Sequence, residues 1–182
     1  MTESEIMEQI LLDHTYYGTD GGVTFSGGEP LLHRDILLSL IERCREAGIH
    51  TAVETSLIIF DEAVFSAVDY VMADIKLMDS ERHRQYVGQE NTRILENFRK
   101  LDKLNKPILV RTPIVPTVND TPEDVSAIRN FVRTLKNAVG YELLPYHPLG
   151  EPKRKALGLE PTCFTVPTLE KMEALKFYAD LF

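Results

Sequence analysis

The sequence contains no tryptophan and only two cysteines among its 182 residues. Cys44 and Cys163 lie far apart in the chain and follow no metal-binding spacing, so they indicate neither a disulfide framework nor a self-contained zinc or iron–sulfur site. No stretch approaches the roughly 18 apolar residues of a membrane span, and the N-terminal residues lack the basic start of a signal peptide. These absences predict a cytoplasmic protein that has no membrane partner.

Positive charge is also scarce. The sequence has 20 Lys and Arg against 28 Asp and Glu, and the resulting net charge of −8 repels a polyanion. Nucleic acid is therefore not an expected partner. The one compact basic run, Lys153–Lys155, is flanked by Gly150 and Gly158, which favours a solvated loop. A docking site for an acidic partner is the alternative interpretation of this run.

The rest of the composition is that of an ordinary globular protein, and a chain of this length is expected to form one domain spanning residues 1–182. Short β-rich runs alternate with amphipathic segments, which is typical of βα units around a parallel sheet. The expected strands are Gly22–Phe25, His50–Glu54, Tyr70–Lys76, Ile108–Val115 and Tyr141–Pro145. The sequence therefore predicts an α/β fold.

Helices are expected between the strands and at both ends of the chain. The expected helical segments are Met1–Leu12, Leu31–Ala47, Asn91–Leu104, Thr121–Leu135 and Pro167–Leu181. In the second segment Cys44 shares the apolar stripe with Leu40 and Ile41, so we expect its side chain in the core. Asn91 and Thr121 are expected N-caps, and the proline that follows Thr121 suits the first helical position.

Polar or glycine-containing sequences follow every expected strand. In parallel βα folds, ligands bind at the carboxyl ends of the strands. These ends are Ser26–Pro30, Glu54–Ser56, Asp74–Lys76, Arg111–Pro116 and Pro145–His147. Gly27 and Gly28 let the backbone approach a ligand without Cβ atoms in the way, and the Glu29 carboxylate can accept from an ammonium group. An ordinary βα turn is the alternative interpretation of this loop.

Alternation along a strand places Asp74 and Lys76 on one face, where they can act on the same ligand. A simple salt bridge between the two is the alternative.

Five strings together resemble the glycyl-radical-enzyme activating branch of the radical S-adenosylmethionine enzymes, the family of pyruvate formate-lyase activating enzyme. They are Gly22–Pro30, Gly48–Ser56, Met72–Lys76, Val110–Pro116 with Asn119-Asp120, and Leu143–Gly150, and they occur in the family's order. The resemblance implies a partial parallel (β/α) barrel, with about five strands here of a six-stranded family barrel. It also implies S-adenosylmethionine as cofactor and a [4Fe–4S] cluster in the full-length protein.

The same resemblance assigns site residues. It implies S-adenosylmethionine contacts for Ser26, Gly27, Gly28, Glu29, Glu54, Asp74, Lys76, Arg111 and His147. The loop that ends in Glu29 would receive the amino group, Arg111 would face the ligand carboxylate or the target peptide, and His147 would lie near the adenosyl group. A monovalent cation bound by oxygen atoms of Glu54, Thr55, Met72 and Asp74 is a further expectation from the family.

One family element is missing from the sequence. Members carry Cys-x-x-x-Cys-x-x-Cys after their first strand to hold the cluster, and Cys44 and Cys163 cannot replace three thiolate ligands. We therefore interpret the chain as truncated before the family's second strand, with no catalytic residue of its own and no activity alone. The unpaired edge strand left by such a truncation is expected to favour dimerisation or aggregation.

The full protein would cleave S-adenosylmethionine reductively and take a glycine hydrogen from a pyruvate formate-lyase-like partner, with flavodoxin or ferredoxin as electron donor. Two alternatives remain open. One is a non-catalytic module that binds S-adenosylmethionine or a partner. The other is a conventional βα-barrel enzyme acting on a phosphorylated metabolite, although Pro145–Pro148 offers few amide donors for a phosphate near the last strand.

Overall fold

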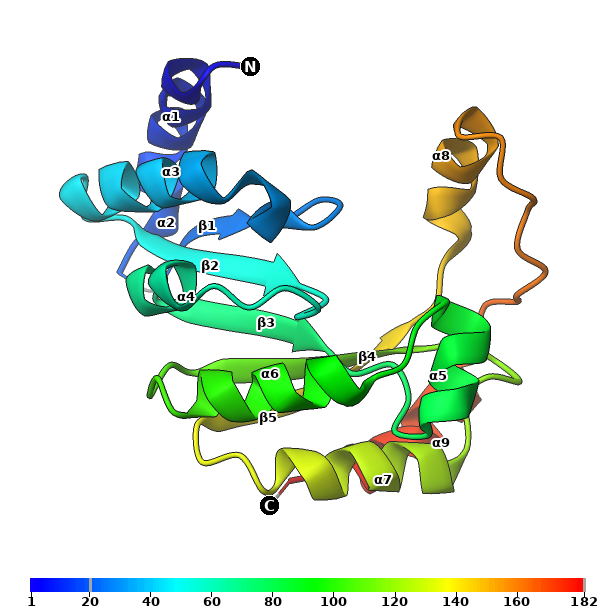
Figure 1. The fold of residues 1–182 in the computed structure, drawn as a ribbon. Coiled ribbons are helices and arrows are strands. Elements are labelled where there is room, and N and C mark those ends of the chain that lie inside the picture. The colour runs from blue at the N-terminus through cyan, green and yellow to red at the C-terminus, as the bar shows by residue number, and fades with distance from the viewer. Residues whose placement is uncertain (20, 182) are drawn as a thin grey trace. The chain divides into compact units, whose positions relative to one another are not determined.

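The computed structural model describes residues 1–19 and 21–181 and has five strands, in the sheet order β1-β2-β3-β4-β5 (Figure 1). The strands are β1 (Gly22–Phe25), β2 (His50–Thr55), β3 (Tyr70–Asp74), β4 (Ile108–Ile114) and β5 (Ala138–Pro145). The helices are α1 (Glu3–Leu12), α2 (His14–Tyr17), α3 (Arg34–Glu46), α4 (Glu62–Ala67), α5 (Ser80–Val87), α6 (Thr92–Asp102), α7 (Pro122–Val132), α8 (Glu151–Ala156) and α9 (Leu169–Ala179), and 3-10 turns precede α3 at Pro30–His33 and α8 at Pro148–Gly150.

The strands are parallel. β1 pairs with β2 and β2 with β3 in parallel register. The bonds from Val71 N to Pro107 O (3.1 Å) and from Ile75 N to Arg111 O (3.0 Å) advance together along β3 and β4, as a parallel ladder requires. The bonds from Ile108 N to Asn137 O and from Tyr146 N to Ile114 O do the same for β4 and β5. The predicted α/β class with a parallel sheet is confirmed.

Most element boundaries differ from the sequence expectations by one to three residues, and the larger differences are in β3, β5, α7 and the basic run. β3 ends at Asp74, two residues earlier than expected, and β5 begins at Ala138, three residues earlier than expected. α7 ends at Val132 rather than near Leu135. The basic run Lys153–Lys155, expected to be a loop, lies in the short exposed helix α8. Arg154 of this helix donates to the Glu160 carbonyl, beyond its C-terminal end, at 2.7 Å.

The chain divides into two compact units. The first comprises Met1–Asp74, Thr92–Leu109 and Leu135–Val139, and the second comprises Ile75–Asn91, Val110–Thr134 and the chain from Gly140 onward. That residues 1–182 form a single domain stays a prediction.

In the first unit, α1 packs on α3, which lies along β1 and β2 (Figure 1). Met7 and Ile10 of α1 meet Leu40 and Cys44 of α3 in one buried cluster. Cys44 is completely buried, which confirms the core position expected from helical spacing.

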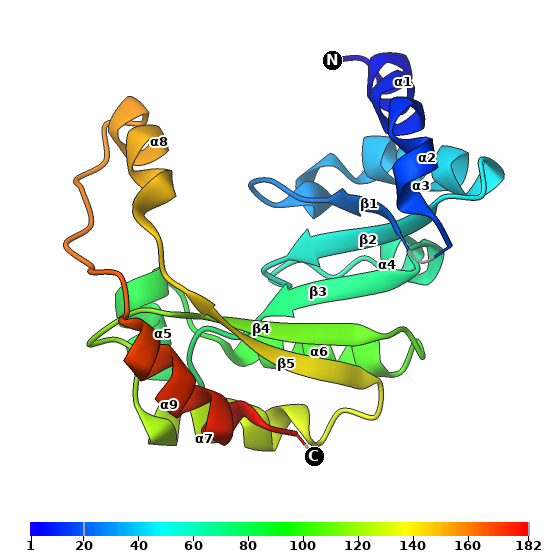
Figure 2. The same cartoon turned by 180° about the vertical axis from the view of Figure 1, so that it is seen from behind.

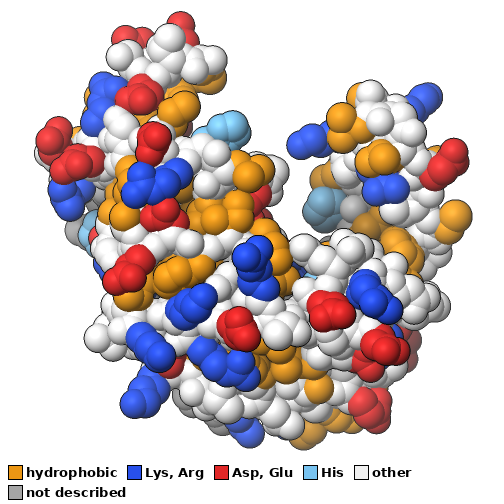
Figure 3. All heavy atoms as spheres, viewed as in Figure 1, with side chains coloured by type: hydrophobic (Ala, Val, Ile, Leu, Met, Phe, Trp, Pro, Cys, Tyr) orange, Lys and Arg blue, Asp and Glu red, His pale blue; other side chains and the backbone are white. Residues whose placement is uncertain are grey.

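In the second unit, α7 and α9 lie side by side, and α9 runs next to β5 (Figure 2). Ile114 at the end of β4 joins Val125 of α7 and Leu175 of α9 in a second buried cluster. Among the described residues no helix is long and apolar enough to cross a membrane. On the face drawn in Figure 3, acidic and basic side chains are interspersed rather than separated by sign.

The predicted cap of α7 is confirmed. The Thr121 hydroxyl accepts from Asp124 N at 3.2 Å, and Pro122 occupies the first helical position. Thr121→Ala should therefore lower the free energy of unfolding by about 1 kcal/mol in urea denaturation, because one helix N–H loses its acceptor. Thr165→Ala, at an exposed threonine outside the helices, is the control and should change stability by less than about 0.5 kcal/mol. Equal losses in the two variants would contradict a specific capping role.

Candidate functional site

The loop after β1 presents bare backbone to solvent. Gly27 and Gly28 are exposed and have φ values of 95° and 44°, a backbone conformation that residues with a Cβ atom rarely adopt. A Cβ placed on either glycine would meet no atom within 4 Å, so the space beside the loop is open. Backbone N–H and C=O groups in this loop are therefore accessible to a polar ligand.

Glu29 anchors this loop to the end of β2. Its Oε2 accepts from Ser56 N (3.0 Å) and Ser56 Oγ (2.7 Å), and its Oε1 accepts from Thr55 Oγ1 (2.7 Å) and more weakly from Leu31 N (3.5 Å). A carboxylate offers about four acceptor positions, and each of these meets a donor. We call Glu29 with Thr55 and Ser56 the Glu29 clamp. An ammonium group bound to Glu29 would therefore have to share carboxylate oxygens that already accept hydrogen bonds from Thr55 and Ser56.

Sequence reasoning identified Glu29 as a ligand acceptor but not as a clamp, and it gave no role to Ser56. The two residues are 27 positions apart, and only the strand pairing brings them together. The available signal was the polar string Glu54–Ser56 at the end of a neighbouring strand.

Carboxylates line one face of the sheet in the first unit. Register pairs Glu54 with Met72 and Thr55 with Ala73. Glu54, Met72 and Asp74 are half-buried and share one face, since side chains alternate along each strand. The Thr55 side chain points to the opposite, buried face and belongs to the Glu29 clamp. Of the three side chains predicted to bind a monovalent cation, Glu54 and Asp74 thus share one face and Thr55 does not, while Met72 was expected to contribute its backbone carbonyl; the site stays a prediction.

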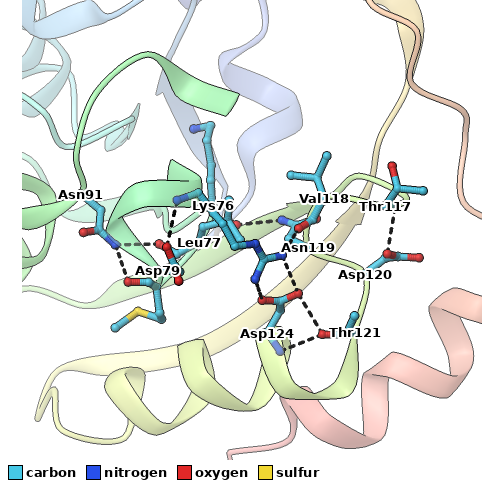
Figure 4. A network of polar contacts seen from close by, with 12 residues as sticks. Lys76, Leu77, Asp79, Asn91, Thr117, Val118, Asn119, Asp120, Thr121 and Asp124 are labelled. Carbon is cyan, nitrogen blue, oxygen red and sulfur yellow. Dashed lines mark hydrogen bonds and ion pairs between the residues drawn. The ribbon is translucent and has the colours of Figure 1, made fainter. Parts of the chain in front are cut away.

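Lys76 follows β3 in the second unit and is half-buried. Figure 4 shows the polar contacts around it: Asn119 Nδ2 donates to the Lys76 carbonyl at 2.8 Å, and Asn91 Nδ2 donates to the Leu77 and Met78 carbonyls at 2.9 and 2.8 Å. Sequence reasoning assigned Asn91 to the N-cap of the next helix; in the structure its amide hydrogens bond this loop. Asn119 received no role, although it lies in one of the strings that carry the family resemblance.

Arg111 and Thr112 occupy opposite faces of β4. Arg111 is half-buried, whereas Thr112 is completely buried, accepts from Tyr141 Oη at 3.2 Å and donates to the Ile75 carbonyl at 2.6 Å. Burial raises the pKa of the Tyr141 phenol far above its ordinary value, and the bond to Thr112 offsets this only in part. Tyr141 therefore stays protonated and serves as a donor.

His147 lies exposed just after β5. Its neighbour Tyr146 reaches Thr162 Oγ1 through its hydroxyl at 2.9 Å, and Thr162 in turn donates to the Glu151 carboxylate. Tyr146 also lines a cavity of about 300 Å³, whose other lining residues are Lys76, Leu77, Tyr86, Val87, Pro113, Val115, Val118, Asn119 and Phe164. The second unit thus places Lys76, Asn119 and Tyr146 around one largely apolar cavity.

The described residues do not fit an iron–sulfur cluster. The part of the chain that the structure describes contains no group of three or more His, Cys, Asp or Glu placed to hold a metal ion. Cys44 Sγ lies 4.0 Å from Met7 Sδ inside the first unit's core, and burial raises the pKa of its thiol. Cys163 is exposed. Neither cysteine has a second thiol within the same unit to share a cluster.

Comparison with known proteins identifies relatives of this chain. The model of the Radical SAM superfamily matches residues 1–132. The chain is 40% identical over 164 residues to the 4-hydroxyphenylacetate decarboxylase activating enzyme of Clostridioides difficile strain 630, covering 87% of this chain and 52% of that protein. It is 42% identical over 162 residues to the isethionate sulfite-lyase activating enzyme of Desulfovibrio desulfuricans, covering 86% and 52%. The chain thus spans about half the length of these two relatives.

A solved structure agrees with these matches. A crystallised domain of pyruvate-formate lyase-activating enzyme from Bacteroides vulgatus ATCC 8482 superimposes with a TM-score of 0.69 at 30% identity, covering 86% of this chain and 94% of that one. The fold neighbours confirm the predicted partial-barrel architecture, and the sequence relatives confirm the predicted family. The chain belongs to the radical SAM superfamily, in which its homologues are activating enzymes of glycyl-radical enzymes.

Proposed function

We propose that this chain is the S-adenosylmethionine-binding part of an activating enzyme that removes a glycine hydrogen from a partner glycyl-radical enzyme. The observation that carries the proposal is the open Gly27-Gly28 loop, held to β2 by the Glu29 clamp in a chain of this family. An exposed, fixed loop of this kind supplies backbone acceptors and donors for an amino-acid moiety at little ordering cost.

The predicted contact residues have chemistry that suits S-adenosylmethionine. The Ser26–Gly28 backbone suits the amino group, and the carboxylates of Glu54 and Asp74 attract its positive charge. The cations of Lys76 and Arg111 suit the ligand carboxylate, for which a planar guanidinium is a two-pronged donor. His147 is the proposed contact of the adenosyl group. When bound, S-adenosylmethionine supplies a carbon–sulfur bond that breaks on one-electron reduction.

The cysteines that hold the iron–sulfur cluster are proposed to lie outside this sequence. For this reason the chain alone is proposed to be inactive and to act only as a binding module. The partner is proposed to be a pyruvate formate-lyase-like enzyme, and the electron donor a flavodoxin or ferredoxin.

The test compares two forms of the protein under anaerobic conditions with iron and sulfide. One is this chain, and the other restores the coding sequence that precedes it. The longer form is expected to gain iron and sulfide and to cleave S-adenosylmethionine to 5′-deoxyadenosine and methionine, whereas this chain is not. If the upstream sequence encodes no three-cysteine motif and the longer form cleaves nothing, the proposed function is wrong.

Thermal unfolding separates the proposal from a phosphate-metabolite enzyme. S-adenosylmethionine is expected to raise the melting temperature of the longer form, since a ligand that binds only the folded state stabilises it. Protection by inorganic phosphate without any effect of S-adenosylmethionine would favour the phosphate-metabolite enzyme instead.

A further inference from the structure

Four consecutive carbonyl groups after β3 each accept a hydrogen bond from a side chain. Thr112 Oγ1 donates to Ile75 O (2.6 Å) and Asn119 Nδ2 donates to Lys76 O (2.8 Å). Asn91 Nδ2 donates to the next two carbonyls, Leu77 O (2.9 Å) and Met78 O (2.8 Å). Most side-chain hydrogen bonds are scattered along a chain, so an unbroken run of four indicates that this segment is held in one conformation.

The donors are all buried and come from three separate places in the second unit. Thr112, Asn119 and Asn91 are 0%, 2% and 3% exposed. Thr112 lies on β4, Asn119 in the loop that joins β4 to α7, and Asn91 immediately before α6. Because buried polar atoms are costly unless paired, these donors and the segment's carbonyls fix one another.

Asn119 is itself fixed at every polar atom. Its Oδ1 accepts from Val115 N at 2.7 Å, and its Nδ2 donates to Pro113 O at 2.9 Å in addition to Lys76 O. The loop that carries Asn119 is held in turn by Arg82, which donates to the Val118 carbonyl and pairs with Asp124 at 2.7 Å. The hydrogen bond to Asp124 raises the pKa of Arg82, so the guanidinium stays charged. The result is a rigid frame around residues 75–78.

Among residues 75–78, Lys76 alone has a cationic side chain. A lysine side chain has many rotamers, and fixing its backbone lowers the entropy lost when its ammonium meets a ligand. We infer that Thr112, Asn119 and Asn91 are positioning residues for Lys76, which they hold so that its ammonium meets an anionic group of the bound ligand. The inference rests on the proposed function, in which that group is the carboxylate of S-adenosylmethionine.

The experiment measures the Kd of radiolabelled S-adenosylmethionine by equilibrium dialysis, using the longer, cluster-reconstituted protein. Asn119→Ala and Thr112→Val are each expected to raise Kd by about 3- to 10-fold, the loss that follows from one misplaced hydrogen-bonding group. Thr112→Ser keeps the donor and should restore a Kd near that of the wild type. Asn137→Ala is the matched control, because Asn137 also donates its amide to a backbone carbonyl, Asp102 O at 2.6 Å, but before β5 rather than after β3.

A double-variant comparison separates positioning from general loss of structure. In a Lys76→Met background, Asn119→Ala should no longer change Kd, because the group that it positions is gone. An undiminished effect of Asn119→Ala in that background would overturn the inference. So would a rise in Kd for Asn137→Ala as large as that for Asn119→Ala.

Amide hydrogen exchange tests the frame without a ligand. Exchange across residues 75–79 should accelerate in Asn119→Ala and Thr112→Val but not in Asn137→Ala, and no acceleration would overturn the inference. If the wild type binds no S-adenosylmethionine or Lys76→Met leaves Kd unchanged, the proposed function or the role of Lys76 fails. If both of those hold and the Asn119 and Thr112 variants bind like the wild type, only the positioning inference fails.

Discussion

Replacing Glu29 by glutamine is expected to weaken S-adenosylmethionine binding by about tenfold or more, although Glu29 need not contact the ligand. Ser56 N and Leu31 N can only donate, and they meet different carboxylate oxygens, so either orientation of a glutamine amide leaves one of them facing a nitrogen that cannot accept. At least one bond to a charged acceptor is lost, which is worth about 1.5–3 kcal/mol and corresponds to tenfold or more in an equilibrium constant. The attachment of the Gly27-Gly28 loop to β2 is then weakened.

Equilibrium dialysis of the longer, cluster-reconstituted protein measures this effect, and Glu42→Gln is the matched control. Glu42 is an exposed residue of α3 whose ion pair with Arg45 spans one helical turn at the surface. Such pairs contribute little, so the control should bind like the wild type. Ligand binding by Glu29→Gln at wild-type affinity would show that the Glu29 clamp does not set the loop's binding conformation.

Replacing Phe65 by alanine is expected to lower the free energy of unfolding by about 3–5 kcal/mol. Phe65 on α4 is completely buried, and its ring packs against that of Phe60 with centroids 5.3 Å apart. Truncation removes the buried ring and leaves a cavity whose walls cannot fully close. A loss of this size is a large part of the stability of an ordinary domain.

Urea denaturation followed by circular dichroism is the measurement, with Phe177→Ala as the matched control. Phe177 on α9 is 78% exposed and contacts Tyr178 edge-on, so its truncation should cost less than about 1 kcal/mol. Similar losses in the two variants would mean that the α4 core is not packed as the structure shows.

The sequence was a good guide where local chemistry decides the structure. β1 matches its expected range, Thr121 caps α7, and Cys44 is in the core because helical spacing places it on the apolar stripe. Helix α5 was not predicted, although the sequence contains local signals for it: Asp79 caps its start, and Gly88 ends it with φ 90°. Features of this kind depend on residues only a few positions apart.

Where the structure differs from expectation, the determining contacts are distant in sequence. β3 was expected to include Lys76 because its residues favour strands, but Thr112 and Asn119 take the carbonyls of residues 75 and 76 from 37 and 43 positions away. The Glu29 clamp likewise spans 27 positions. Residue type and spacing revealed which residues belong to the candidate site, whereas the partners that orient them required the strand pairing.

The unequal environments of the two cysteines have a practical consequence. Cys44 is sealed in the core with a raised pKa, so little reactive thiolate forms there, while Cys163 is exposed. A maleimide dye is therefore expected to label the native chain at Cys163 alone, and Cys44 need not be removed by mutagenesis. That position precedes Phe164, whose ring lies 6.0 Å from that of Tyr146 and lines the 300 Å³ cavity. A fluorophore attached to Cys163 of the unmodified sequence would therefore report the binding of a ligand in that cavity.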